Sequence, residues 1–247
     1  MSPPLVRRPM APIRSRRPRR APVVLSVGGS VLATGDGDAV YIDKLSQLLR
    51  TLEREFPLVV TTGGGRTARE YIRLGRALGL TEVELDEIGI EVTRLHARIL
   101  AARIGPPAPA HPPTSIAAAV HEAHRGSLVV LGGTEPGHTT DGVAALLAAR
   151  LRASRLVNAT RVDGVYDADP RKVPGARLLP RLTWSKFRHM VQQATGVQEA
   201  GQEYVFDRLG ADLLARAGIP LRIVNGRDLD NLEAALRGLA FHGTRVG

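Results

Sequence analysis

The sequence of 247 residues has no cysteine, only three lysines and no long apolar segment. The absence of cysteine excludes disulfide bonds and thiolate metal ligands, and it is typical of proteins from reducing compartments. No apolar run approaches the roughly 20 residues that a membrane-spanning helix requires. The basic start is not followed by the apolar segment of a secretory signal peptide. These absences predict a cytoplasmic protein with no membrane partner.

Several motifs of well-known enzymes are also missing. The chain has no GxxxxGK[ST] sequence, no strict GxGxxG after a predicted strand and no protein-kinase signature, which argues against P-loop proteins, dinucleotide-binding folds and protein kinases. His138 is one of seven histidines, and the second candidate ligand at metal-site spacing from it is Asp141. We therefore expect no dedicated metal site, and we expect His138 to hydrogen-bond with a ligand or with the backbone.

The formal net charge of +10 is concentrated at the N-terminus. Residues 1–20 contain seven arginines, five prolines and no acidic residue, and such a segment cannot hold a helix or a central strand. We interpret residues 1–21 as a disordered arm and residues 22–247 as the folded domain. The arm's seven charges leave +3 for that domain (10 − 7), so nucleic acid is not expected as its partner. The arm itself either has no role or contacts nucleic acid or another anionic surface.

From residue 22 onward, short apolar segments alternate with segments of helical periodicity. We predict strands at residues 23–27, 58–62, 127–131, 155–160 and 220–225, a hairpin after residue 163 and a short C-terminal strand. We predict helices at residues 41–54, 67–78, 82–104, 115–124, 184–194, 207–217 and 229–239, and one that follows residue 141. Strands that are apolar throughout are buried on both faces, so the pattern predicts an α/β fold with a mainly parallel sheet.

Two features of this pattern concern organisation. The sequence becomes rich in turn residues near residue 160, which predicts two lobes within the domain, at about residues 22–158 and 159–247. The helix predicted at residues 82–104 has too many apolar residues for one narrow stripe, which indicates burial on two sides, as in a subunit interface.

Three of the predicted strands lead directly into glycines and then into a helix. The three turns are GGS at residues 28–30, GGG at residues 63–65 and GGT at residues 132–134. Ligands bind at the carboxyl ends of parallel strands, where helix N-termini attract phosphate and glycine permits close approach of the backbone. We therefore expect an anionic, nucleotide-like ligand. The alternative is that the glycines only make tight turns.

Polar residues near these turns have two interpretations each. Arg66 and Arg69 either bind phosphate or lie in solvent. Asp86 and Glu87 either accept hydrogen bonds from a sugar or cap a helix. Three aspartates of the turn-rich segment either orient Mg²⁺ and cationic side chains or cap turns, namely Asp163, Asp167 and Asp169.

Five segments together resemble the amino-acid kinase superfamily and, within it, the archaeal-type uridylate (UMP) kinases. They are VGGSVL (27–32), GGGRTAREYI (63–72), LDEIGIEVTRLHA (85–97), GGTEPGHTTDGVAALLA (132–148) and ATRVDGVYDADP (159–170). The fourth segment is the most specific. The resemblance extends from about residue 23 to residue 244, and it implies a three-layer αβα sandwich with a mainly parallel central sheet, the amino-acid kinase-like fold.

This resemblance implies transfer of the γ-phosphoryl group of ATP to UMP, with Mg²⁺ accompanying ATP, in a homo-oligomer that is a hexamer built from dimers. The residues it implies for ATP are Gly29, Ser30, Gly65, Arg69, Thr160, Tyr166 and Asp169. Those it implies for UMP are Gly64, Asp86, Thr134, Glu135, Pro136, Gly137, His138, Thr139 and Thr140. Asp141 and Arg161 are the candidate catalytic residues. Asp141 either organises the charged site or caps the following helix, and Arg161 either neutralises phosphate charge or alters the adenine pocket.

The chain departs from the family pattern at three places. Ser26 and Val27 occupy the region where many members carry a lysine, and Arg161 stands where archaeal members have asparagine. Residues 200–216 retain only Asp207 and Ala211 of a serine-rich segment. The segments YVFD (204–207) and IVNG (223–226) resemble molybdenum storage proteins, which share the fold, bind ATP and store oxoanions. Such storage, or phosphorylation of another small acceptor such as isopentenyl phosphate, is the alternative function.

Overall fold

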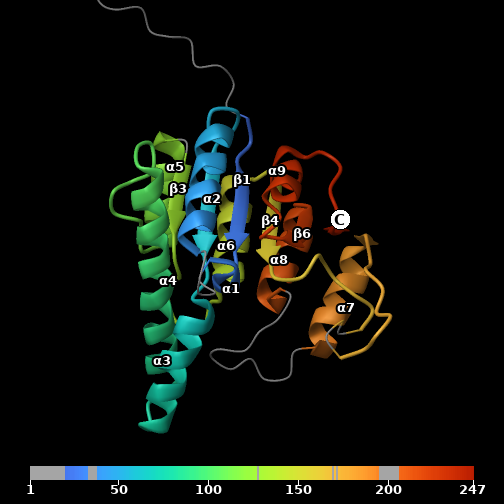
Figure 1. The fold of residues 1–247 in the computed structure, drawn as a ribbon, viewed down its shortest axis with the longest axis horizontal. Coiled ribbons are helices and arrows are strands. Elements are labelled where there is room, and N and C mark those ends of the chain that lie inside the picture. Colours follow the sequence, from blue (N-terminus) through green and yellow to red (C-terminus); the bar gives the residue numbers. More distant parts are fainter. Residues whose placement is uncertain (1–19, 33–37, 127, 169, 171, 195–205) are drawn as a thin grey trace, which may run out of the picture.

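The apolar segments predicted as strands pair side by side in one sheet in the computed structural model (Figure 1). The structure describes residues 20–247 except 33–37, 127, 169, 171 and 195–205. Most of the predicted arm, residues 1–19, and the candidate ATP ligand Asp169 therefore lie outside the described residues. Within the described ranges, no helix combines the length and the apolar character needed to cross a membrane.

The sheet has a parallel part and a short antiparallel end. Its strands, in spatial order, are β3 (Leu128–Leu131), β2 (Leu58–Thr62), β1 (Val23–Val27), β4 (Arg155–Thr160), β6 (Leu221–Asn225), β7 (Thr244–Val246) and β5 (Arg181–Leu182). The first five strands are parallel, β7 runs antiparallel to β6, and β5 is parallel to β7. The predicted mainly parallel sheet is confirmed. The boundary predicted between two lobes, at residues 158 and 159, falls within β4, so both lobes contribute to the same sheet.

Helices cover both faces of this sheet, which completes the predicted three-layer αβα sandwich. One layer consists of α2 (Asp38–Leu52), α4 (Glu82–Ile104) and α9 (Leu229–Arg237). The other consists of α5 (Ile116–Arg125), α6 (Thr140–Leu151), α7 (Trp184–Ala194) and α8 (Arg208–Ala217). Two further helices, α1 (Gly29–Leu32) and α3 (Gly65–Ala77), begin at glycine turns.

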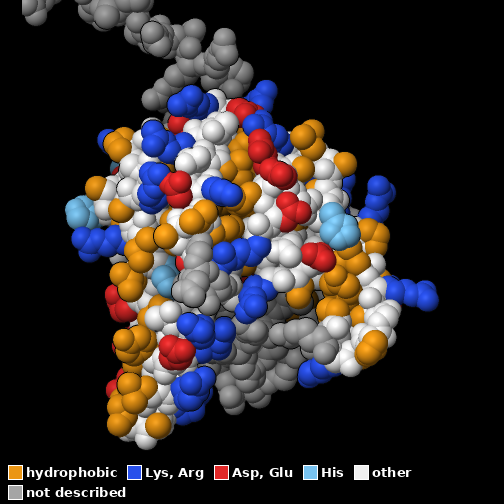
Figure 2. All heavy atoms as spheres, in the orientation of Figure 1, with side chains coloured by type: hydrophobic (Ala, Val, Ile, Leu, Met, Phe, Trp, Pro, Cys, Tyr) orange, Lys and Arg blue, Asp and Glu red, His pale blue; other side chains and the backbone are white. Residues whose placement is uncertain are grey.

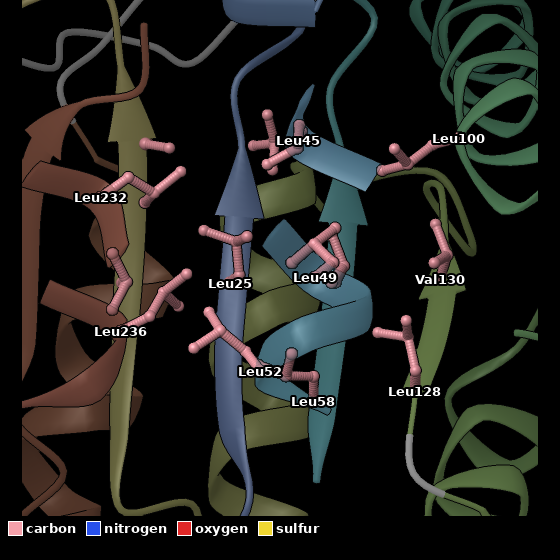
Figure 3. Close-up of a cluster of buried hydrophobic side chains, with 14 of the residues drawn as sticks. Leu25, Leu45, Leu49, Leu52, Leu58, Leu100, Leu128, Val130, Leu232 and Leu236 are labelled. Carbon is pink, nitrogen blue, oxygen red and sulfur yellow. The ribbon is translucent and has the colours of Figure 1, made fainter. Parts of the chain in front are cut away.

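Alternate residues of each strand point into the two cores. Leu25 of β1 and Val130 of β3 lie in the first core, which also contains leucines of α2, α4 and α9 (Figure 3). Their neighbours Val24 and Val129 lie in the second core, which also contains residues of α5, α6 and α8. Because both faces are covered, the central strands are buried and mostly apolar, as the sequence pattern indicated.

The predicted hairpin after residue 163 is a minimal one. Tyr166 forms an isolated antiparallel bridge with Leu178, and Leu179 donates its N–H to the carbonyl of Val165 at 2.8 Å. Two elements, α1 and β5, were not predicted from the sequence. These elements have four and two residues, which is too short for any periodic pattern to appear.

Candidate active site

The glycine turns lie at one edge of the sheet, where the parallel strands end. β3, β2 and β1 are neighbours, and the last residues of β1 and β2, Val27 and Thr62, are in register. Gly63 donates its N–H to the carbonyl of Val27 at 2.9 Å, and Gly28 donates its N–H to the carbonyl of Ala159 in β4 at 2.9 Å. The turns therefore meet at the edge where open parallel sheets bind ligands.

Two of the turns pack backbone against backbone. A Cβ atom on Gly29 would lie 2.0 Å from the amide nitrogen of Gly65, and one on Gly63 would lie 2.5 Å from that of Gly29. Gly65 also has a φ of 59°, a conformation that favours glycine. α3 begins here, and its N-cap residue, Gly64, provides no side-chain hydrogen bond. The first N–H groups of α3 are thus available to an anion.

Arginines of α3 differ in their surroundings. Arg69, which the resemblance implies for ATP, is half-buried in the second turn of the helix. Arg66 is exposed and pairs with Glu70 at 3.5 Å, which favours its interpretation as a solvated arginine. Ser30, the other side chain implied for the ATP phosphates, is the second residue of α1, next to the packed glycines.

A further group of implied ATP residues lies where β4 and β6 end. Thr160 closes a tight turn, since its Oγ1 donates to the carbonyl of Val162 at 2.9 Å and accepts from the N–H of Val162 at 3.1 Å. Tyr166 donates its hydroxyl to Asp163 Oδ2 at 3.2 Å. The amide of Asn225 donates to Asp163 Oδ1 at 3.1 Å. Asp163 therefore connects the ends of two strands instead of capping a single turn.

Arg161, one of the two candidate catalytic residues, follows β4 directly and is exposed. It lies at the same edge of the sheet as the glycine turns. Asp167 accepts a hydrogen bond from the N–H of Arg177 at 2.8 Å, which favours its interpretation as a turn residue.

The loop implied for UMP, residues 134–140, is attached to α4. Asp86 accepts a hydrogen bond from the N–H of Gly137 at 2.9 Å, and Gly137 has a φ of 84°. His138 Nδ1 lies 3.2 Å from Glu135 Oε1, so its neighbour in the structure is a carboxylate of its own loop and not the backbone. Thr139 caps α6 by accepting from the N–H of Gly142 at 3.0 Å. Direct contacts of these residues with UMP stay a prediction.

Three polar residues of α4 bind the glycine turns that follow β2 and β3, and none of the three was predicted to have a role. Thr93 Oγ1 accepts a hydrogen bond from the N–H of Gly133 at 2.6 Å. Arg94 donates to the carbonyl of Gly133 at 3.2 Å and to that of Thr134 at 3.0 Å. His96 Nδ1 lies 2.8 Å from the carbonyl oxygen of Gly63. Two of the three, Thr93 and His96, are buried polar residues in a helix that is otherwise apolar on that side, and this was the signal available in the sequence.

Asp141 lies at the centre of the sheet edge. It is the second residue of α6, and the Ser26 hydroxyl of β1 donates to its Oδ1 at 2.6 Å. Burial raises the pKa of Asp141 from 3.8 to about 7; the Ser26 hydrogen bond opposes this rise and the nearby carboxylate of Asp207 adds to it. Asp141 therefore contacts β1 and lies near Asp207, the N-cap of α8, whereas the N-cap of α6 is Thr139. From the sequence, Ser26 was noted only as a departure from the family pattern, and its hydrogen bond to Asp141 was not predicted.

The site geometry can be compared with known proteins. Residues 21–225 match the amino acid kinase family. The uridylate kinase of Methanothermobacter thermautotrophicus is 41% identical over 217 residues, which are 87% of this chain and 95% of that protein. The uridylate kinase of Methanothrix thermoacetophila is 42% identical over 224 residues, which are 91% of this chain and 98% of that protein.

Solved structures agree with this comparison. The crystal structure of uridylate kinase from Archaeoglobus fulgidus is similar with a TM-score of 0.80 and 37% identity, and it covers 91% of this chain and 99% of its own. The UMP kinase of Bacillus anthracis has a TM-score of 0.74 at 21% identity, which supports the fold alone. The chain belongs to the amino acid kinase family and, within it, to the archaeal-type uridylate kinases.

Proposed function

We propose that this protein transfers the γ-phosphoryl group of ATP to UMP, giving UDP and ADP, as a step of pyrimidine nucleotide synthesis in the cytoplasm. The observation that carries the proposal is the loop GGTEPGHTTD (residues 132–141), which the structure attaches to α4 beside the other two glycine turns. Relatives that are about 40% identical over most of the chain are uridylate kinases. This supports UMP as the acceptor bound by that loop.

The chemistry needs no general base. The phosphate of a nucleoside monophosphate is already largely dianionic at neutral pH, because its second pKa is about 6. Catalysis then consists of positioning two phosphate groups in line and neutralising charge at the transferring phosphoryl group. The uncapped N–H groups of α3, the half-buried Arg69 and the exposed Arg161 supply positive charge at this edge. We assign ATP to the ends of β1, β2 and β4, and UMP to residues 134–140.

Mg²⁺ is proposed to arrive together with ATP. Across the part of the chain that the structure describes, no three His, Asp or Glu side chains form a metal cluster. Mg²⁺ commonly binds through substrate phosphates and one or two carboxylates, which fits this arrangement. Asp141 is the carboxylate that we assign to this role. It accepts a hydrogen bond from Ser26, which stands two residues before the first glycine turn. When bound, the ion would neutralise charge on the ATP phosphates.

The experiment that tests the proposal measures ADP release with ATP, Mg²⁺ and a panel of acceptors. UMP should be turned over faster than CMP, dUMP, AMP or isopentenyl phosphate. Clear turnover of isopentenyl phosphate without turnover of UMP would replace the proposed acceptor. No turnover with any acceptor, together with retention of ATP and molybdate on a desalting column, would favour the storage function.

We also propose that the chain self-associates through α3 and α4, as the first step toward a hexamer built from dimers. Hydrophobic side chains gather along these helices (Figure 2). Tyr71, Leu78 and Leu95 are 55%, 72% and 54% exposed. A groove of about 730 Å³ lies along α4, between Tyr71 on one side and Pro136 on the other. An apolar surface of this kind is typical of a subunit contact, and a second copy of the chain would bury it.

Light scattering during gel filtration tests this association. Replacing Leu95 with aspartate should shift the protein to a smaller species. The matched control is Leu239→Asp, because Leu239 is 59% exposed just after α9, in a different part of the chain. A mass equal to one chain for the wild type at micromolar concentration would refute self-association.

A further inference from the structure

The N-termini of α6 and α8 meet at a contact between Thr139 and Asp207. The Thr139 hydroxyl donates a hydrogen bond to Asp207 Oδ2. The other carboxylate oxygen of Asp207 accepts from the N–H of Gly210 at 2.6 Å and thereby caps α8. Only 5% of Asp207 is exposed. One buried carboxylate thus accepts hydrogen bonds from two helices that lie far apart in the sequence.

Glycines make this contact possible. A Cβ atom on Gly142 would lie 2.7 Å from Asp207 Oδ2, and one on Gly210 would lie 3.3 Å from the Cβ of Ala145. A side chain at Gly142 would therefore displace the Asp207 carboxylate, and one at Gly210 would press against Ala145. The contact also fixes the position of α8 relative to α6.

Thr139 connects this contact to the site. It is the N-cap of α6 and belongs to the loop that we assign to UMP, and Asp141 follows two residues later. Asp141 in turn accepts the hydrogen bond from Ser26 in β1. We propose that Asp207 is a positioning residue, which holds Thr139 from the C-terminal lobe and so fixes the acceptor loop and Asp141 in one arrangement. This inference rests on the proposed function, because it concerns the acceptor side of the same site.

The proposed role requires a carboxylate at residue 207, because two hydrogen-bond donors point at this side chain. The Thr139 hydroxyl and the Gly210 N–H each bind a different oxygen of Asp207. An asparagine of the same size has one acceptor oxygen and one NH₂ group. If its oxygen keeps the Gly210 N–H, its NH₂ group faces Thr139, and the Thr139 hydroxyl proton loses its charged acceptor. The charge of Asp207 also acts on Asp141, although burial is the larger cause of the raised pKa there. Asp207 can therefore affect the site through both geometry and charge.

The test compares Asp207→Asn with Asp228→Asn. Asp228 is also the N-cap aspartate of a helix, α9, and it accepts from the N–H of Asn231 at 3.0 Å. Asparagine and aspartate are equivalent N-caps, so Asp228→Asn should leave kcat and both KM values close to those of the wild type. Asp207→Asn should lower kcat/KM for UMP by about tenfold or more, as expected for the loss of a hydrogen bond to a charged group, with little change in KM for ATP.

Amide hydrogen exchange provides a readout that does not depend on activity. Peptides that cover residues 134–143 should exchange faster in Asp207→Asn than in the wild type or in Asp228→Asn. Unchanged exchange, or equal losses of activity in the two variants, would overturn the role of Asp207. If the wild type fails to phosphorylate UMP, the proposed function fails, and the exchange experiment still decides whether Asp207 holds this loop.

Discussion

Replacing Asp141 with asparagine should change how the stability of the protein depends on pH. Burial, opposed by Ser26 and reinforced by Asp207, raises the pKa of Asp141 from 3.8 to about 7. A carboxyl group with a higher pKa in the folded chain than in the unfolded chain binds more protons when folded. Its contribution to stability is therefore complete below about pH 4, decreases as the pH rises toward 7, and is lost above that pH.

The magnitude follows from the two pKa values. At 1.36 kcal/mol per pH unit, the difference corresponds to an upper bound of about 4 kcal/mol. The residue is partly exposed, and screening by solvent reduces the expected effect to about 2 kcal/mol. Asparagine keeps the shape and can still accept the hydrogen bond from Ser26. By pH 5 about one third of this effect is already lost, because the ordinary pKa of the group is 3.8. The variant should therefore gain about 1 kcal/mol relative to the wild type between pH 5 and pH 8.

Urea unfolding at pH 5 and pH 8, at one fixed protein concentration, measures this difference. The control is Asp230→Asn, because Asp230 is the second residue of α9 as Asp141 is of α6, and it is exposed. The control should show no such gain. If the wild type and Asp141→Asn change in parallel between the two pH values, Asp141 is ionised throughout, and the reasoning from burial is wrong.

Three further predictions follow from the packing. Arg94→Ala should raise KM for UMP by about tenfold, because it frees two loop carbonyls, whereas the exposed Arg98→Ala on the same helix should leave steady-state kinetics unchanged. Gly29→Ala should destabilise the chain by about 3 kcal/mol or more in urea unfolding, since its Cβ would lie 2.0 Å from the backbone of Gly65. Thr81→Ala should cost about 1 kcal/mol of stability through loss of the capping box of α4, with kcat unchanged.

The sequence predicted those parts of the fold that have a local signal. Strands such as residues 23–27 are continuous apolar runs that end in glycine, and both features can be read within ten residues. The helices are similarly marked by periodicity and by caps such as Thr81 and Ser115. The spatial order of the strands was not predicted, because it depends on contacts between segments that are far apart in the sequence. The reversal of β7 was not predicted, since a strand of three residues carries no sign of its direction.

The candidate site was predictable to a lesser degree. The glycine turns and the loop at residues 134–140 are continuous in the sequence, so a candidate ligand site could be predicted from them. Ser26 and Asp141 are 115 residues apart, and Thr139 and Asp207 are 68 residues apart. Such polar pairs produce no periodicity, and each member taken alone has an ordinary local explanation. The roles of buried polar residues therefore become visible only when the fold brings the partners together.

Burial raises the pKa of Asp141, and placing a lysine in β1 would test whether a neighbouring cation can oppose that effect. Ser26 is 1% exposed and supplies a neutral donor where a lysine would supply a cation. In Ser26→Lys, the ammonium group would pair with Asp141, lower its pKa and reverse the sign of the pH effect, so that stability would increase as the pH rises from 5 to 8.

The extra volume of the lysine would cost about 1–3 kcal/mol of stability in this packed interior. Adding Asp141→Asn to this variant would leave a buried cation without a partner, at a further cost of about 3 kcal/mol. Urea unfolding of the two single variants and the double variant measures this coupling. Additive losses would show that residues 26 and 141 do not interact through charge.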